Sequence, residues 1–423
     1  MAVAMEAQQS AGMADLAARL TKRLADANSD RNLVFSPLSI HAVLALLAAG
    51  AVGDTLEEIL RVLGAPSRSE LEDSVARLLD GPLGDRSSEP DGGGPSVAFA
   101  CGVWSDLTRP LKPAFRDAVV GTYNTRPMPA PSTSATTQSK RRDRSTRGQR
   151  RPRGTSSTEN RPFYRLDGTA VDVPFLSNHN RHFIAEHDGF KVLQLRYRSS
   201  SRHARADAGG VSMCIFLPDA CDGLGILLDK ITSSSPAGFL REHLPKRAVP
   251  VGEFGVPKFE LSFQSSLVGV LNDLGLRLPF THDADLSEML DDGLPFQVQD
   301  VFHKAVIQVD EEGTKAAAVT MSSFYSPACP PDLSRRVDFV ADHPFAYFIV
   351  EEASHAVLFA GHVVDPGNGA GAVIPSPPPF DQCTTTKREP EDEVMNKYTA
   401  YGPVQPTSDL SRTNLHILRV VDK

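Results

Sequence analysis

The sequence has few cysteines, and they form no recognisable pattern. The 423 residues contain five, none of them in a C-x-x-C pair: Cys101, Cys214, Cys221, Cys329 and Cys383. An odd and sparse set excludes a disulfide framework, offers no zinc site and suits a reducing compartment. Cys214 lies in the apolar run 211–217, where we expect it to be buried and to pack in the core like a small apolar side chain.

Long apolar runs and a secretory layout are also missing. No window approaches the roughly 20 apolar residues that span a bilayer, and residues 1–20 lack a basic-then-apolar order. The formal net charge of -8 gives no general attraction for nucleic acid or anionic membrane. We therefore expect no membrane partner and a cytoplasmic or nucleocytoplasmic location.

The sequence carries no common catalytic motif. Gly-x-Ser-x-Gly, His-Glu-x-x-His, the P-loop and Gly-x-Gly-x-x-Gly are all absent. Asp342 and His343 are adjacent in sequence, which is a poor arrangement for a catalytic pair. We expect a protein that is not an enzyme and that has no cofactor and no metal site.

The apolar spacing predicts a mixture of helices and strands. Thr55, with Glu58 three residues later, fits a capping box for a helix over 56–63. The two most apolar strands, 345–350 and 356–364, are expected to lie deepest. The other predicted helices are 12–27, 38–49, 112–123, 224–231 and 267–274, and the other predicted strands are 96–104, 163–166, 171–175, 182–184, 191–197, 211–217, 256–263 and 302–309.

Two segments are too polar to form a core. Residues 124–160 contain almost nothing apolar, and the run 140–153 within them concentrates eight basic residues. We predict disorder for 124–160 and for most of the tail 367–423. The basic run is a candidate nuclear-localisation or nucleic-acid contact. Charge runs are more often merely solvated, so we do not expect a nucleic-acid partner.

Three widely separated blocks carry a family resemblance. They are 32–40 (NLVFSPLSI) with 50–55 (GAVGDT), 302–320 (FHKAVIQVDEEGTKAAAVT), and 337–345 (VDFVADHPF) with 357–366 (VLFAGHVVDP). Together with 162–168 (PFYRLDG) and 256–259 (VPKF), they cover most of 10–123 and 160–366. The chain resembles the serpins, a family of serine protease inhibitors, in their plant form, the serpin-Z type.

The resemblance implies an α+β serpin fold: three β-sheets with surrounding helices and an exposed reactive-centre loop. It implies one serpin domain over 1–366, in which 124–160 is a divergent insertion, and an extension over 367–423. Its implied partner is a serine or cysteine protease, which cleaves the loop and is held while the loop inserts into the main sheet. It also implies a monomer and makes an extracellular location an alternative.

The hinge of the loop is expected over Glu312, Gly313, Thr314, Lys315, Ala316, Ala317 and Ala318. Alternate side chains of a strand share a face, so Thr314, Ala316, Ala318 and Thr320 would enter the sheet together. All four are small, whereas Lys315 falls on the opposite, solvent-facing side. Without the flanking blocks, the start of an ordinary alanine-rich helix would be the favoured interpretation of the same run.

Family spacing puts the reactive bond at Pro327–Ala328, with Tyr325 and Ser326 as alternatives. Cleavage after Phe324 or Tyr325 would suit a chymotrypsin-like protease, and cleavage after Ala328 an elastase-like one. Proline beside a scissile bond fixes the backbone and removes a hydrogen-bond donor, so this segment is a poor substrate for a serine protease.

By resemblance, Ser36, Ser39 and His303 match the shutter, a hydrogen-bonded cluster beneath the main sheet. Helix capping and core packing are the alternative roles for the same three residues. A buried imidazole needs hydrogen-bond partners in either case, so both interpretations can hold together.

The sequence departs from the family between Tyr123 and Pro162. There the resemblance implies an edge strand, a long helix and a central strand of the main sheet, and none of the three is recognisable. A buried central strand requires an apolar run, which 124–160 does not contain. We therefore expect inhibition to be poor or lost, with a non-inhibitory binding or storage protein, or a degenerate gene product, as the alternatives.

Overall fold

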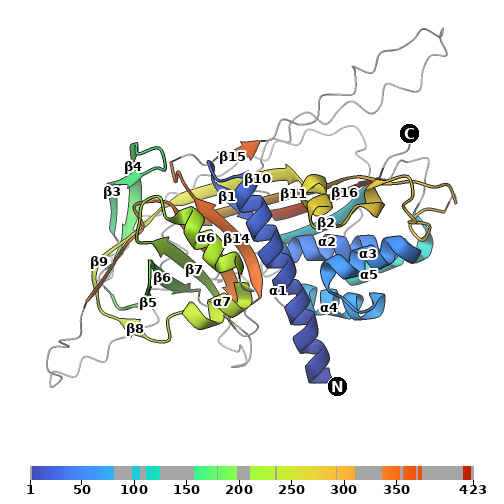
Figure 1. Cartoon of the computed structure of the whole chain (residues 1–423), viewed down its shortest axis with the longest axis horizontal. Helices are drawn as coiled ribbons and strands as arrows, with labels where there is room; N and C mark the ends of the chain where they lie inside the picture. Colours follow the sequence, from blue (N-terminus) through green and yellow to red (C-terminus); the bar gives the residue numbers. More distant parts are fainter. Residues whose placement is uncertain are drawn as a thin grey trace, which may run out of the picture.

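The computed structural model in Figure 1 describes twelve segments of the chain. They are residues 2–80, 98–104, 111–123, 157–178, 180–197, 210–233, 236–291, 293–309, 336–352, 356–367, 370–373 and 413–420. Their strands form three sheets and are accompanied by helices, which confirms the predicted α+β class with three sheets.

The largest sheet has seven strands and contains the deepest part of the core. In spatial order they are β1 (Leu33–Phe35), β14 (Val357–Val363), β13 (Phe345–Glu351), β7 (Val211–Pro218), β6 (Phe190–Arg196), β5 (His182–His187) and β8 (Ala248–Val249). Every residue of β14 is buried, and so is every residue of β13 except its last. β13 and β14 are deeply buried as predicted, but the adjacent β7, all of whose residues are buried, lies equally deep.

The second sheet brings together strands from distant parts of the chain. Its order is β15 (Ala370–Val373), β10 (Phe259–Ser266), β11 (Val298–Val309), β16 (Thr413–Val420) and β2 (Ala98–Trp104). β16 therefore lies between β11 and β2, as the labels in Figure 1 also show. We call this sheet the five-stranded sheet.

The third sheet is made of β12 (Val337–Val340), β9 (Val251–Pro257), β4 (Ala170–Ser177) and β3 (Ser157–Tyr164). β3 and β4 form an antiparallel pair around the turn at Gly168, whose φ is 79°. A glycine adopts this left-handed conformation without steric cost. The region 162–168 thus contains the end of β3 and the turn of a β3–β4 hairpin, which lies at one edge of the molecule (Figure 1).

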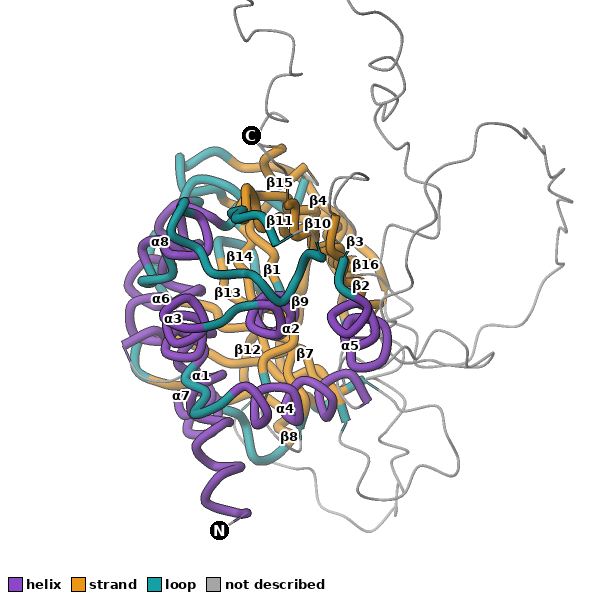
Figure 2. Tube along the Cα trace, turned by 90° about the vertical axis from the view of Figure 1, so that its right-hand side faces the viewer, coloured by secondary structure: helices purple, strands orange, loops and turns teal. Residues whose placement is uncertain are grey.

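The helices gather mainly along one side of the strands, as Figure 2 shows for α1, α3, α6, α7 and α8. α1 also crosses α6 and β14 (Figure 1). The described helices are α1 (Ala2–Ala27), α2 (Pro37–Gly50), α3 (Gly53–Leu63), α4 (Arg68–Asp80), α5 (Pro113–Tyr123), α6 (Leu224–Ser233), α7 (Pro236–His243), α8 (Val268–Asp273) and the 3₁₀ turn η1 (Leu278–Phe280). None of them is long and apolar enough to cross a membrane.

The central helix α2 is buried on nearly all sides. It is apolar all round rather than along one stripe, which is typical of a helix enclosed by other elements. It packs against β14, β16 and β2 on the strand side and against α1, α3, α4 and α5 on the other. α2 therefore carries the amino-terminal block into the middle of the fold.

Two predictions from the sequence are wrong in detail. α3 begins at Gly53, so Thr55 and Glu58 are inside the helix and form no capping box. The Thr55 hydroxyl instead accepts from the backbone N–H of Asp285, and the Glu58 carboxylate accepts from that of Leu278. The predicted strand 256–263 is divided at Lys258 between β9 and β10, which belong to different sheets.

Strands also occur inside the two segments for which we predicted disorder. Residues 157–160 begin β3, and the tail supplies β15 and β16. The physical reason is pairing: each segment adds its backbone to an edge that an existing strand already offers. The rest of 124–160 and of 367–423 lies almost wholly outside the described residues.

Gly361 in β14 has no room for a side chain. A Cβ there would lie 2.0 Å from the Leu33 carbonyl oxygen and 2.7 Å from the Tyr347 hydroxyl. That hydroxyl donates to the same Leu33 oxygen at 3.2 Å. The close approach of β1 to β14 therefore depends on glycine.

We predict that Gly361→Ala lowers the free energy of unfolding by about 3 kcal/mol, because the strands must move apart to admit the methyl group. Gly225→Ala is the matched control: a Cβ there meets nothing within 4 Å, and α6 gains up to about 1 kcal/mol of helix propensity. Urea unfolding of both variants measures the difference. Equal stabilities would contradict the packing argument.

Candidate functional site

The structure brings Ser36, Ser39 and His303 together. Ser36 is the N-cap of α2, and its hydroxyl accepts from the backbone N–H of Ser39 at 3.2 Å. The two serine hydroxyls are 2.7 Å apart. The backbone N–H of Ser36 donates to Nε2 of His303 at 3.3 Å. The start of α2 is thus joined to the middle of β11.

All three side chains of this cluster are completely buried. Nε2 of His303 is an acceptor, so its ring is neutral and carries its proton on Nδ1. Burial lowers the pKa of His303 to about 3, in agreement with this assignment. The cluster is therefore a fixed polar link within the core, and it presents no group to solvent.

β11 alternates between the core and the surface. Val301, His303 and Ala305 are buried, whereas Phe302 and Lys304 are partly exposed. Its last residue, Val309, is also the last described residue before the chain resumes at Arg336. The cluster is thus carried by the strand that leads directly into 310–335.

The predicted hinge and reactive bond lie outside the described residues. This applies to Glu312, Gly313, Thr314, Lys315, Ala316, Ala317 and Ala318, and to Tyr325, Ser326, Pro327 and Ala328. Their proposed roles remain predictions.

β16 is the element near the cluster that the sequence reasoning missed. In its antiparallel pairing with β11, His416 lies opposite His303. In its parallel pairing with β2, the same residue lies opposite Cys101. The available signal was the short run 415–420 (LHILRV), which is rich in strand-forming residues within an otherwise polar tail.

A family model described as "Serpin (serine protease inhibitor)" matches residues 11–144 and 151–366. The chain belongs to the serpin family. Rice (Oryza sativa subsp. japonica) Serpin-Z2A is 43% identical to this serpin over 420 residues, covering 84% of this chain and 97% of the relative. Wheat (Triticum aestivum) Serpin-Z1C is 36% identical over 376 residues, covering 79% and 90%.

A solved plant structure shows the same fold. The structure of Arabidopsis AtSerpin1, titled as its native stressed conformation, matches with a TM-score of 0.65 and 30% identity. The match covers 86% of this chain and 98% of the Arabidopsis chain. The resemblance to plant serpins and the serpin fold are therefore confirmed.

The carboxy-terminal block of this serpin contains a second buried polar link. Nε2–H of His343 donates to the Pro218 carbonyl at 2.7 Å, and Nδ1–H donates to the Asp342 carboxylate at 2.8 Å. Two donating nitrogens describe an imidazolium. Burial alone would lower the pKa of His343, but these two hydrogen bonds raise it above its ordinary value. The adjacent Asp342 and His343 thus fasten β7 to the turn before β13.

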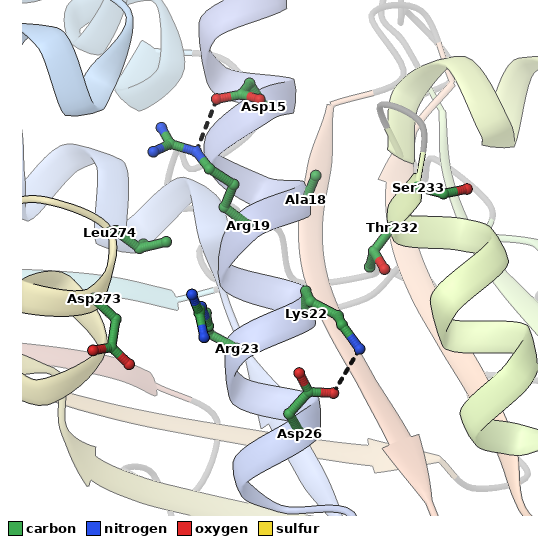
Figure 3. A pocket seen from close by; sticks show the side chains of 10 residues that line it. All are labelled: Asp15, Ala18, Arg19, Lys22, Arg23, Asp26, Thr232, Ser233, Asp273 and Leu274. Carbon is green, nitrogen blue, oxygen red and sulfur yellow. Dashed lines mark hydrogen bonds and ion pairs between the residues drawn. The ribbon is translucent and has the colours of Figure 1, made fainter.

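A surface cavity of about 590 Å³ lies beside α1 and does not resemble a ligand site (Figure 3). Arg19 pairs with Asp15 at 2.8 Å, and Lys22 pairs with both Asp26 and Asp229, at 2.9 and 2.6 Å. Opposite charges therefore largely balance along its wall. No group of three or more metal-binding side chains occurs among the residues that the structure describes.

The neutral state of His303 predicts a loss of stability in acid. Its pKa is lower when folded (about 3) than when unfolded (6.5), so protons favour the unfolded chain below pH 6.5. Between pH 7 and pH 5 this one group should cost about 2 kcal/mol. We expect His303→Gln to reduce the pH dependence of urea unfolding by that amount. Parallel pH profiles of variant and wild type would contradict the assignment.

The charged state of His343 predicts the opposite trend. A raised folded pKa contributes stability that is complete below the unfolded pKa and is lost as pH rises through the folded value. We expect His343→Gln to lower the free energy of unfolding more at pH 5.5 than at pH 9. A cost that is equal at both values would indicate that His343 is neutral in the folded protein.

Proposed function

We propose that this serpin inhibits a serine protease by presenting the residues between β11 and β12 as a cleavable reactive-centre loop. The observation that carries the proposal is the convergence of the family blocks around β11. The amino-terminal block contacts β11 through Ser36 and His303, and β11 itself leads into the alternating small residues of the predicted hinge. A cysteine protease is the alternative target class.

The geometry suggests how the cluster would serve such a loop. His303 sits in the half of β11 remote from the loop, tied to the N-cap of α2, so this strand stays fixed while a cleaved segment moves beside it. An entering segment must bury one face, and an unpaired polar or charged group there would cost roughly several kcal/mol. Thr314, Ala316 and Ala318 avoid that cost. We infer that Ser36, Ser39 and His303 act as the shutter.

We further propose that inhibition is poor in this copy. No strand from 124–156 is described in the five-stranded sheet, and β16 from the tail stands next to β11 instead. The same observation favours a second function, that of a non-inhibitory serpin-fold binding or storage protein. In either case we propose a monomer with a cytoplasmic or nucleocytoplasmic location.

Incubation with chymotrypsin and with elastase tests the proposal. We expect cleavage within 324–329, accompanied by a minor fraction of a complex that survives denaturing electrophoresis. Cleavage with no complex at all would favour the second function. A stoichiometric complex would contradict our inference of poor inhibition, and resistance to both proteases would remove the loop from its proposed role.

Two hinge variants separate capture from cleavage. Ala316→Glu should abolish the remaining complex, because its carboxylate would have to enter the sheet, while cleavage continues at the wild-type rate. Lys315→Glu is the matched control on the opposite face and should keep the complex. The ratio of complex to cleaved protein measures both. Equal ratios in the two variants would contradict insertion by alternation.

A further inference from the structure

β11 has a partner on both of its edges. β10 pairs with it along 302–309, and β16 pairs with it along 298–304. Within the described residues, only the stretch 305–309 has β10 as its sole partner. The edge of β11 toward β2 is therefore paired along 298–304, remote from the loop, and no described residue pairs with it along 305–309.

We propose that β16 is a built-in stop in the five-stranded sheet. A segment that turns back from Val309 can pair beside 305–309, but it then meets β16 at Lys304. The tail of the chain thereby limits how far another strand can enter beside β11.

The direction of β16 supports this role. β16 runs antiparallel to β11 and parallel to β2. A segment that continues from β11 and folds back on it by a tight turn also runs antiparallel to β11. The two segments would therefore present their backbone groups to the same row of donors and acceptors along 298–304. Only one of them can occupy that place at a time.

Two properties of the tail favour retention of β16. It forms a ladder on each side, so its departure would leave unpaired backbone groups on both β11 and β2. It is also tethered to the fold, because β15 pairs with β10 at the far edge of the sheet and residues 374–412 connect the two strands. Rebinding of a tethered strand is an intramolecular event with a high effective concentration.

The register places the stop at the level of the buried cluster. His303, His416 and Cys101 lie opposite one another across three adjacent strands. His303 is held by the backbone of Ser36. The point where β16 is fixed is thus the point where β11 is tied to α2. Full entry of a cleaved loop, which rests on the proposed function above, would require β16 to leave this position.

The native Cys101 allows a direct test of the register. Neighbouring strands lie about 4.8 Å apart, which is within the range that a disulfide bridges. We expect the full-length His416→Cys protein to form a disulfide with Cys101 when glutathione disulfide is added. The two thiols lose their hydrogens and the oxidant becomes two glutathiones. Peptide mapping identifies the linked pair.

Ile417→Cys is the matched control for this cross-link. Adjacent residues of a strand point to opposite faces, so a thiol at this position should not reach Cys101. A link in the first variant and none in the second supports the proposal. No link in either variant, or equal links in both, would overturn it.

A peptide-binding measurement tests the stop itself. The probe is a fluorescein-labelled synthetic peptide with the sequence of residues 312–320. Leu418→Pro removes a backbone donor from β16 and should open the edge of β11, whereas Ser408→Pro, in the connecting segment, should not. We expect Leu418→Pro to bind the peptide at least about a hundredfold more tightly than the oxidised His416→Cys protein. Equal binding would overturn the stop.

The oxidised and reduced forms of one His416→Cys preparation give a second comparison, which does not depend on the folding of the proline variant. The oxidised form should bind the peptide more weakly, and equal affinities would contradict the proposal. Failure of every form to capture a protease would count against the proposed function alone, because cross-linking and peptide binding need no protease.

Discussion

A strand in the interior of a sheet must have both rows of its backbone groups paired, and β11 is where this constraint matters most. The chain meets it with β10 on one side and, for much of its length, with β16 on the other. α2, the Ser36–Ser39–His303 cluster and the approach to 310–335 are all positioned by this strand. In this serpin a segment of the tail, residues 413–420, satisfies much of the requirement.

The sequence predicts most of the fold because its signals are local. The apolar run of α2 and the continuous apolar stretches of β13 and β14 are visible without any partner, and Ser36 before Pro37 indicates a helix start. The contacts of Thr55 and Glu58 were not predictable, because the backbone N–H groups that donate to them belong to residues more than 200 positions away. β16 was missed for the same reason, since its pairing depends on edges that only the folded sheet provides.

The sequence predicted which residues form the candidate site, but not their protonation states or hydrogen-bond roles. Resemblance named Ser36, Ser39 and His303, and the structure adds that Nε2 of His303 is an acceptor and that its ring is neutral. His343 differs, because its two nitrogens both donate, one of them to the neighbouring Asp342. Their opposite protonation states arise from what each ring faces: a backbone N–H for one, and a carboxylate with a carbonyl for the other.

The place of β16 in the sheet also has a consequence for biosynthesis. β2 is translated early, near residue 98, yet the strand that joins it to β11 is not available until residue 420 has been made. The edges of β2 and β11 that β16 covers therefore stay unpaired while the intervening 300 or so residues are synthesised and fold. Exposed strand edges invite pairing with other chains. A chain whose synthesis stopped before the tail would lack β16, and the edges of β11 and β2 that face it would be exposed. Such a product would be a target for chaperones and for aggregation.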